Sequence, residues 1–209
     1  MTRQPKAKVF GIGFQKTGTS SLGKALEQNG YSVIDFYGTE LPLDELRATY
    51  VARGLELARQ YDAVQDMPWP LMFRELDQAF PRAKFVLTVR DTDSWYKSMV
   101  NHFGTTPTPI RQLTYGEDAP APVGQEARYR EVYEAHSRTV QDYFANRPGD
   151  LLVMDLEAGD GWPELGPFLG LASIPQGPFV HANPAAMRQT LGYRLKRRIY
   201  QVRRLLRLT

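Results

Sequence analysis

The first apolar segment of the chain runs directly into a turn of glycine and hydroxyl residues, and this junction constrains the fold more than any other feature. Residues 9–14 have the composition of a buried strand, and Lys16 stands among glycine, threonine and serine before a helical pattern begins at Thr19. Backbone N–H groups at such a turn converge on one point, and the helix dipole adds partial positive charge there. The segment therefore predicts an anion-binding loop.

The position of the lysine separates this loop from the common nucleotide-binding loop. In the pattern G-x-x-x-x-G-K-[ST] the lysine follows the last glycine, whereas Lys16 precedes Gly18. This register argues against ATP or GTP as the ligand. Taken alone, the segment is also compatible with an ordinary strand-to-helix turn of small polar residues.

A second strand-to-helix junction carries an arginine at its turn. Arg90 stands where an apolar strand ends, and Ser98 follows in the next helix. A guanidinium binds phosphate oxygens through parallel hydrogen bonds, and a hydroxyl near a helix N-terminus complements it. The alternative makes Arg90 a helix-capping residue or the partner of Asp91 and Asp93 in a salt bridge.

Five apolar stretches are expected to form buried strands, at 9–14, 31–36, 63–67, 84–89 and 151–156. Helical patterns separate them, notably at 19–28, 43–59, 69–79 and 126–146. This alternation predicts an α/β fold with a mainly parallel five-stranded sheet covered by helices on both faces. Ligands of such sheets bind at the carboxyl ends of the strands, where Lys16 and Arg90 both fall.

One segment interrupts this alternation. Residues 104–125 are rich in proline, threonine and glycine and show no periodicity. A stretch of that length predicts a lid, a binding loop or a disordered connection.

Composition limits the chemistry and the compartment. The chain has 209 residues, no cysteine and three histidines, so it has no disulfide or thiolate site, and a histidine-rich metal site is not expected. The length fits a single domain over residues 1–209. The polar N-terminus lacks the apolar core of a signal peptide, and no apolar run reaches the roughly 18 residues of a membrane span, which predicts a cytoplasmic protein.

The two junctions together resemble the cofactor motifs of sulfotransferases that use 3′-phosphoadenosine 5′-phosphosulfate (PAPS). The resemblance runs from about Lys8 to Phe168 and is closer to compact bacterial-type members than to the longer steroid and aryl enzymes. It implies a P-loop-like sulfotransferase fold. It also implies that PAPS is the donor, that adenosine 3′,5′-bisphosphate (PAP) is the product and that no metal is needed.

The same resemblance implies which residues bind the cofactor and what the acceptor is. The 5′-phosphosulfate would be held by Lys16, Thr17, Gly18, Thr19 and Ser20, and the 3′-phosphate by Arg90 and Ser98. Lys16 would stabilise charge on the leaving oxygen. The implied partner is a small-molecule or glycan acceptor with a hydroxyl or amine.

The general base departs from the family pattern. Longer members carry a histidine in a His-x-Pro setting, and here the comparable place reads Gln65-Asp66-Met67-Pro68. Asp66 is therefore the first candidate base, and the alternative is that it caps the helix expected near residue 69. His102 is the second candidate, and Asp35 and His136 follow, although His136 lies on the apolar stripe of a helix and fits a core role.

Three further points stay open. Residues 188–208 form a basic amphipathic pattern, which could pack on the domain, reach the cofactor phosphates, or contact anionic lipid or an acidic partner; no motif indicates nucleic-acid binding. The competing functions are a nucleotide kinase or NTPase with an atypical P-loop, and a non-catalytic interaction module. Aromatic residues either line a cleft for a ring-containing acceptor or belong to the core, namely Trp69, Trp95, Tyr96, Phe103 and Tyr115.

Overall fold

The computed structural model describes residues 6–180 of the chain. The basic segment at 188–208 lies outside these residues. Within the described part, no helix is long and apolar enough to cross a membrane.

Five parallel strands form one sheet in the order β2-β3-β1-β4-β5. The strands are β1 (Val9–Gly11), β2 (Val33–Ile34), β3 (Ala63–Val64), β4 (Lys84–Val89) and β5 (Leu151–Asp155). The predicted fold class and all five strands are confirmed, although most strands are shorter than expected. After β1 the chain turns toward the next helix, and Ile12 and Phe14 are buried in the core, whereas Phe36 after β2 is exposed.

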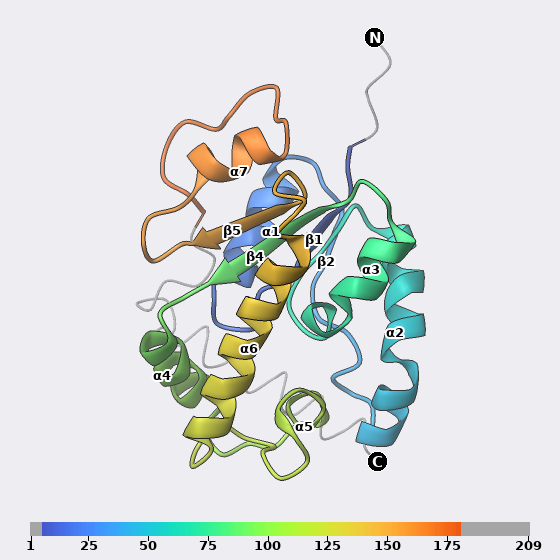
Figure 1. Ribbon diagram of the computed structural model, residues 1–209, viewed down its shortest axis with the longest axis vertical. Helices are drawn as coiled ribbons and strands as arrows, with labels where there is room; N and C mark the ends of the chain where they lie inside the picture. The colour runs from blue at the N-terminus through green and yellow to red at the C-terminus, as the bar shows by residue number, and fades with distance from the viewer. Residues whose placement is uncertain (1–5, 181–209) are drawn as a thin grey trace, which may run out of the picture.

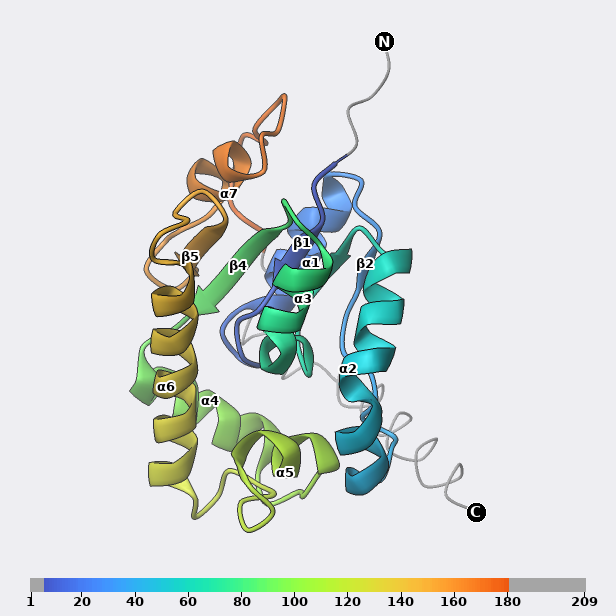
Figure 2. The same cartoon turned by 45° about the vertical axis from the view of Figure 1, so that its right-hand side comes forward.

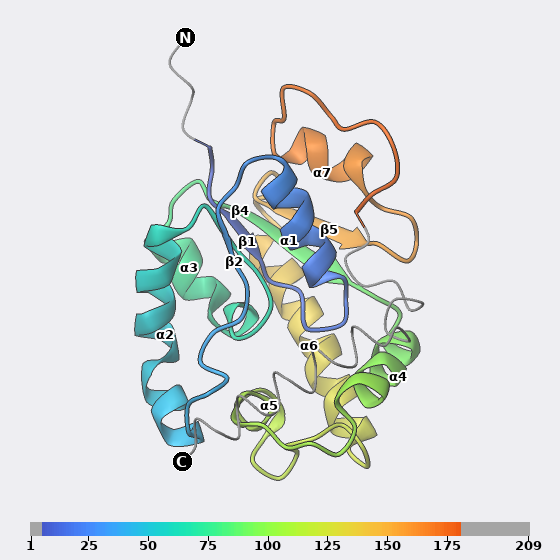
Figure 3. The same cartoon turned by 180° about the vertical axis from the view of Figure 1, so that it is seen from behind.

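Alternate residues of the central strands face opposite layers of helices. Phe10 and Phe85 pack with α2 (Leu43–Gln60), α3 (Phe73–Ala79) and α6 (Glu126–Phe144), whereas Val9 and Val86 pack with α1 (Thr19–Gln28) and α7 (Trp162–Phe168). Figure 1 shows α3 and α6 in front of the sheet, and Figure 3 shows α1 on the other face. Helices therefore cover both faces, as the alternating pattern predicts.

A third cluster closes the molecule beyond the carboxyl ends of the strands. It is built from α4 (Thr92–Phe103), α5 (Pro109–Tyr115) and the first turns of α6, which Figure 2 shows below the sheet. Trp95 stacks on Tyr133 with 4.1 Å between ring centroids. Trp69, Trp95 and Tyr115 are buried, so the core interpretation of these three aromatic residues is correct.

The alternative of a disordered connection at 104–125 was wrong, because α5 forms inside the segment, whereas a role as a lid or binding loop stays a prediction. Thr108 caps this helix by accepting a hydrogen bond from the backbone N–H of Arg111, and Pro109 occupies the first turn. The buried guanidinium of Arg111 donates to the carbonyl oxygens of Thr106 and Pro120 and so joins the two sides of the segment. Seven residues are too few to show helical periodicity, although Thr108-Pro109 is a helix-start signal.

Candidate functional site

The loop between β1 and α1 is fixed from the interior of the protein. The Thr17 hydroxyl donates to the Phe14 carbonyl oxygen at 2.6 Å, and its oxygen lies 2.6 Å from the Thr88 hydroxyl on β4. Gly18 then adopts a left-handed conformation with φ of 108° and starts α1. The Thr17 hydroxyl is thus directed into the protein, which corrects the expectation that it adds a donor to the anion site.

A glycine brings this loop close to β4. A Cβ on Gly13 would lie 2.0 Å from the Thr88 hydroxyl oxygen and 2.4 Å from the Thr88 carbonyl oxygen. Only a residue without a side chain allows the two segments to approach so closely. The end of β1 is thereby held against the strand that carries Arg90.

Lys16 lies at the turn of the loop with φ of 71°, a left-handed conformation that is uncommon for lysine. Its backbone oxygen accepts a hydrogen bond from Nη1 of Arg90 at 3.4 Å. The helix α1, whose first N–H groups have no acceptor within the helix, begins three residues later at Thr19. The loop therefore joins a cation, a helix N-terminus and the strand-end arginine.

Asp66 follows β3 and reaches the start of α1. Its Oδ2 accepts a hydrogen bond from the Thr19 hydroxyl at 3.4 Å, and its Oδ1 accepts one from the Met67 N–H at 2.8 Å. The 3₁₀-helix Trp69–Met72 begins after Pro68 and has no side-chain cap. Asp66 therefore does not cap it, and the capping interpretation was wrong.

The environment of Asp66 makes it more basic than an ordinary aspartate. Its pKa is raised from 3.8 to about 6, chiefly because burial desolvates the carboxylate. The charge of Asp35 adds to this rise, whereas the hydrogen bonds from Met67 and Thr19 and the charge of Lys16 reduce it, and the value of about 6 is the net result. A carboxylate with such a pKa is a better proton acceptor near neutral pH.

Asp35, at the end of β2, lies beside this group. Its Oδ1 accepts a hydrogen bond from Nε2 of the buried Gln65, and its backbone oxygen accepts one from the Trp69 indole at 2.6 Å. The ends of β2 and β3 and the start of α1 thus meet around Asp66.

Arg90 stands at the end of β4, as predicted, but its partners differ from those expected. Its Nη2 forms an ion pair with Oε1 of Glu157 at 2.7 Å. Asp91 instead caps α4 by accepting from the Ser94 N–H, and Asp93 pairs with Arg130. The interpretation of Arg90 as a partner of its neighbouring aspartates was therefore wrong.

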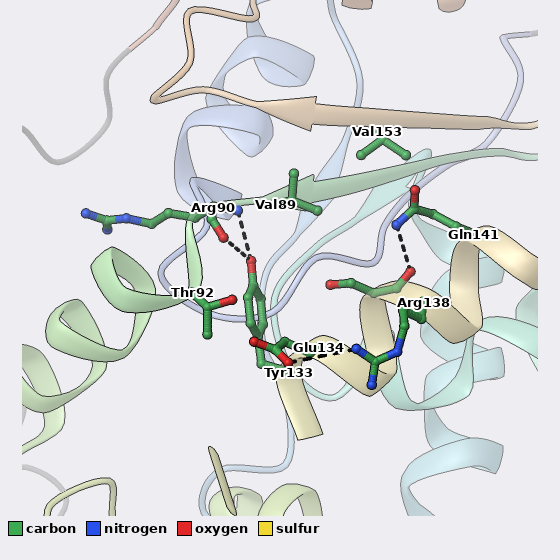
Figure 4. A pocket seen from close by; sticks show the side chains of 9 residues that line it. Val89, Arg90, Thr92, Tyr133, Glu134, Arg138, Gln141 and Val153 are labelled. Carbon is green, nitrogen blue, oxygen red and sulfur yellow. Dashed lines mark hydrogen bonds and ion pairs between the residues drawn. The ribbon is translucent and has the colours of Figure 1, made fainter. Parts of the chain in front are cut away.

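The position of Arg90 is set by Tyr133 on α6. The Tyr133 hydroxyl accepts from the Arg90 N–H at 2.9 Å and donates to the Arg90 carbonyl oxygen at 2.8 Å. Figure 4 shows this pair at one end of a hollow of about 370 Å³ between α6 and strands β4 and β5. Arg138 and Gln141 lie on the opposite side of the hollow, and the Arg90 guanidinium points away from them (Figure 4). We therefore assign the hollow no role in the anion site.

The other predicted residues lie along α4 and α6. Ser98 is buried on α4, about 10 Å along the helix axis from its N-cap at 1.5 Å per residue, and His102 is one turn further, beside Phe103. His136 on α6 stacks on Phe14, and its Nε2 lies 2.8 Å from the Ile12 carbonyl oxygen. Desolvation lowers the His136 pKa to about 4, so the ring is neutral and structural.

Sequence reasoning missed Glu157, Tyr133 and Thr88. Glu157 follows the last strand by two residues, so its place at the carboxyl edge of the sheet was a usable signal. Tyr133 and Thr88 lie on apolar elements, where nothing in the sequence distinguishes them.

Comparison with known proteins agrees with this geometry. The sequence profile of the family described as "Sulfotransferase domain" matches residues 8–187. A curated protein of Aspergillus versicolor, described as "Ava biosynthesis cluster protein M", is 35% identical over 109 residues. That alignment covers 45% of this chain and 42% of the relative, so the chain spans less than half the length of the protein it matches.

The matched region contains the β1–α1 loop, the β4 strand end with Arg90, and the five-stranded parallel sheet that brings them together. The extent of this match over the chain shows that the protein belongs to the sulfotransferase domain family.

Proposed function

We propose that the protein transfers the sulfuryl group of PAPS to a hydroxyl or amine of its acceptor, releasing PAP. The observation that carries the proposal is the convergence of Lys16, Asp66 and Arg90 around one loop. Arg90 donates a hydrogen bond to the backbone oxygen of Lys16. The charge of Lys16 lowers the pKa of Asp66, which also accepts a hydrogen bond from Thr19. A cation, a tuned carboxylate and a guanidinium thus share the carboxyl edge of the sheet.

The residues present fit a nucleotide with two phosphates. Nε of Arg90 is buried and has no hydrogen-bond partner in the described part of the chain, so one donor of the guanidinium is left for an acceptor such as a phosphate oxygen. Lys16 and the first N–H groups of α1 would hold the 5′-phosphosulfate, and Arg90 with Ser98 the 3′-phosphate. PAPS supplies the sulfuryl group.

Lys16 and the residues around the β1–α1 loop then have defined tasks. The Lys16 ammonium stabilises negative charge on the leaving oxygen, as cations do in phosphoryl transfer. Asp66 accepts the proton of the acceptor, for which its raised pKa is suited. His102 is the second candidate base.

The acceptor is most simply a small molecule. The Aspergillus versicolor relative is described as a biosynthesis cluster protein, which supports small hydroxylated metabolites over glycans as the first compounds to screen.

A nucleotide kinase or NTPase is the competing function. The position of Lys16 before Gly18 opposes it. In addition, the strand-end Asp155, which in an ATPase would hold Mg²⁺, accepts hydrogen bonds from the N–H groups of Glu157 and Ala158 at 2.9 and 3.1 Å.

Ligand-dependent unfolding tests the proposal. A ligand that binds only the folded state raises the melting temperature, and at 100 times Kd it stabilises by about 2.7 kcal/mol. We expect a clear shift with PAP and a much smaller one with ATP and Mg²⁺. Equal or greater stabilisation by ATP would overturn the assignment. Formation of PAP from PAPS with an acceptor screen then tests catalysis.

A further inference from the structure

The guanidinium expected to hold the 3′-phosphate already has an anionic partner. Nη2 of Arg90 lies 2.7 Å from Oε1 of Glu157, and the two side chains are 21% and 54% exposed. The arginine is thus mostly enclosed, while the glutamate reaches it from the solvent side. An ion pair of this kind is modest in strength, because water screens the exposed partner.

The turn that carries Glu157 is built independently of the ion pair. Oδ1 of Asp155 accepts from the N–H groups of Glu157 and Ala158, and Oδ2 of Asp160 accepts from the Asp155 N–H at 2.7 Å. The backbone of the turn therefore does not depend on Arg90. The exposed side chain of Glu157 can therefore move away from the guanidinium without disturbing the turn.

A phosphate and Glu157 compete for the same donors. A guanidinium binds a phosphate bidentately through two neighbouring nitrogens. In Arg90, Nε has no hydrogen-bond partner among the described residues, Nη1 donates to the Lys16 oxygen and Nη2 is held by Glu157, so a phosphate bound through Nε and Nη2 would need a nitrogen that Glu157 occupies. Two anions on one enclosed arginine repel each other, and that repulsion is strong where water is scarce. Glu157 must therefore withdraw when a phosphate binds to Arg90.

We propose that Glu157 is an internal counterion that occupies Arg90 in the free protein and is displaced by the 3′-phosphate of the nucleotide. This inference rests on the proposed function, in which Arg90 holds that phosphate. Glu157 neutralises the charge of the Arg90 guanidinium and weakens the binding of every 3′-phosphorylated nucleotide. It therefore makes PAP easier to release.

Two nucleotides that differ only at the 3′ position should respond differently to a change at Glu157. PAP carries the phosphate that displaces Glu157, whereas adenosine 5′-monophosphate (AMP) does not. Removing the charge of Glu157 should therefore improve the affinity for PAP and leave that for AMP unchanged.

The test compares Glu157→Gln with a matched control, Glu117→Gln. Glu117 forms an ion pair with Arg47 at 2.6 Å and is 66% exposed, so its replacement makes the same charge change at an ion pair between α2 and the segment after α5. Calorimetric titration should show about two- to fivefold tighter PAP binding by Glu157→Gln. The control should match the wild type, and neither variant should change AMP binding.

A double variant checks that the effect passes through the arginine. Glu157→Gln should give no gain in PAP affinity in an Arg90→Ala background, because the guanidinium for which Glu157 and the 3′-phosphate compete is then absent. Melting temperatures without ligand confirm that each variant is folded.

Each other outcome counts against the inference. Unchanged or weaker PAP binding by folded Glu157→Gln, or an equal gain for AMP, overturns it while the proposed function stands. A folded wild-type protein that binds no PAP overturns the proposed function and this inference with it.

Discussion

The two anion-handling regions at the carboxyl edge of the sheet are held in different ways. The β1–α1 loop is fixed by buried contacts, namely the Thr17–Thr88 hydroxyl pair and the close approach of Gly13 to β4. The backbone of Arg90 is fixed by Tyr133, but its guanidinium is held by a partly exposed ion pair with Glu157. A rigid loop suits the stabilisation of charge that develops during reaction, whereas an exchangeable ion pair suits binding and release.

The sharpest test of the first region is Asp66→Asn, which keeps the size of the side chain and removes its basicity. As general base, Asp66 should contribute about 10²- to 10⁴-fold to kcat. We expect a loss of that size with near-normal PAP affinity. Steady-state kinetics and PAP titration measure the two quantities, and His102→Gln is the comparison variant.

Stability shows whether the Asp66→Asn protein is intact. The pKa of Asp66 is higher in the folded protein than in the unfolded chain. The free energy of unfolding therefore falls as the pH rises from about 4 to about 6, because the unfolded chain loses this proton first. At pH 7 the asparagine variant should therefore melt no lower than the wild type. Near-normal turnover in a folded variant would move the role of base to His102.

Lys16→Ala should lower kcat by about 10²- to 10³-fold, as removal of one group that stabilises transition-state charge does in other enzymes. Affinity for PAP should change much less, because the charge on the leaving oxygen grows mainly during transfer. Kinetics and titration on one protein preparation separate the effects. A change confined to KM would show that Lys16 only binds the cofactor.

Arg90→Ala should have the opposite profile in the second region. Losing charge-assisted hydrogen bonds of about 1.5–3 kcal/mol corresponds to roughly a 10- to 150-fold rise in the KM for PAPS. The value of kcat should be nearly unchanged. A fall in kcat as large as that of Lys16→Ala would erase the distinction between the two regions.

The pH profile provides a smaller and independent test. A base with a pKa of about 6 must be deprotonated to act, so kcat/KM should rise about tenfold per pH unit below pH 6 and level off above it. The inflection should be absent from the residual activity of Asp66→Asn. If the inflection persists unchanged in that variant, another group is the base.

The smallest effect is expected at the support of the loop. Thr88→Val removes one partner of the buried Thr17–Thr88 pair, while the Thr17 hydroxyl keeps its bond to the Phe14 oxygen. Loss of such a hydrogen bond costs about 1 kcal/mol. Chemical denaturation should show that loss with little change in PAP affinity. A large loss of affinity would mean that the loop depends on this single contact.

Much of the fold was predictable, because buried strands and helices leave local periodic patterns. The helix at Thr19–Gln28 has the predicted bounds, and the strands at Lys84–Val89 and Leu151–Asp155 agree to within one residue. The helix α5 was missed because a seven-residue helix begun by Thr108-Pro109 shows too few turns for an apolar stripe. The neutral, core role of His136 followed from its place on such a stripe.

The sequence by itself determined the residue types at the strand ends, including Lys16, Asp66 and Arg90, because each lies within two residues of the end of a recognisable apolar run. Only the tertiary structure decided which of them meet. Asp66 and Thr19 are 47 residues apart, and Thr17 and Thr88 are 71 apart. The pairing of Arg90 with Glu157 likewise depends on β4 lying beside β5. Such contacts follow from strand order and register, which the spacing of apolar residues along the chain does not encode.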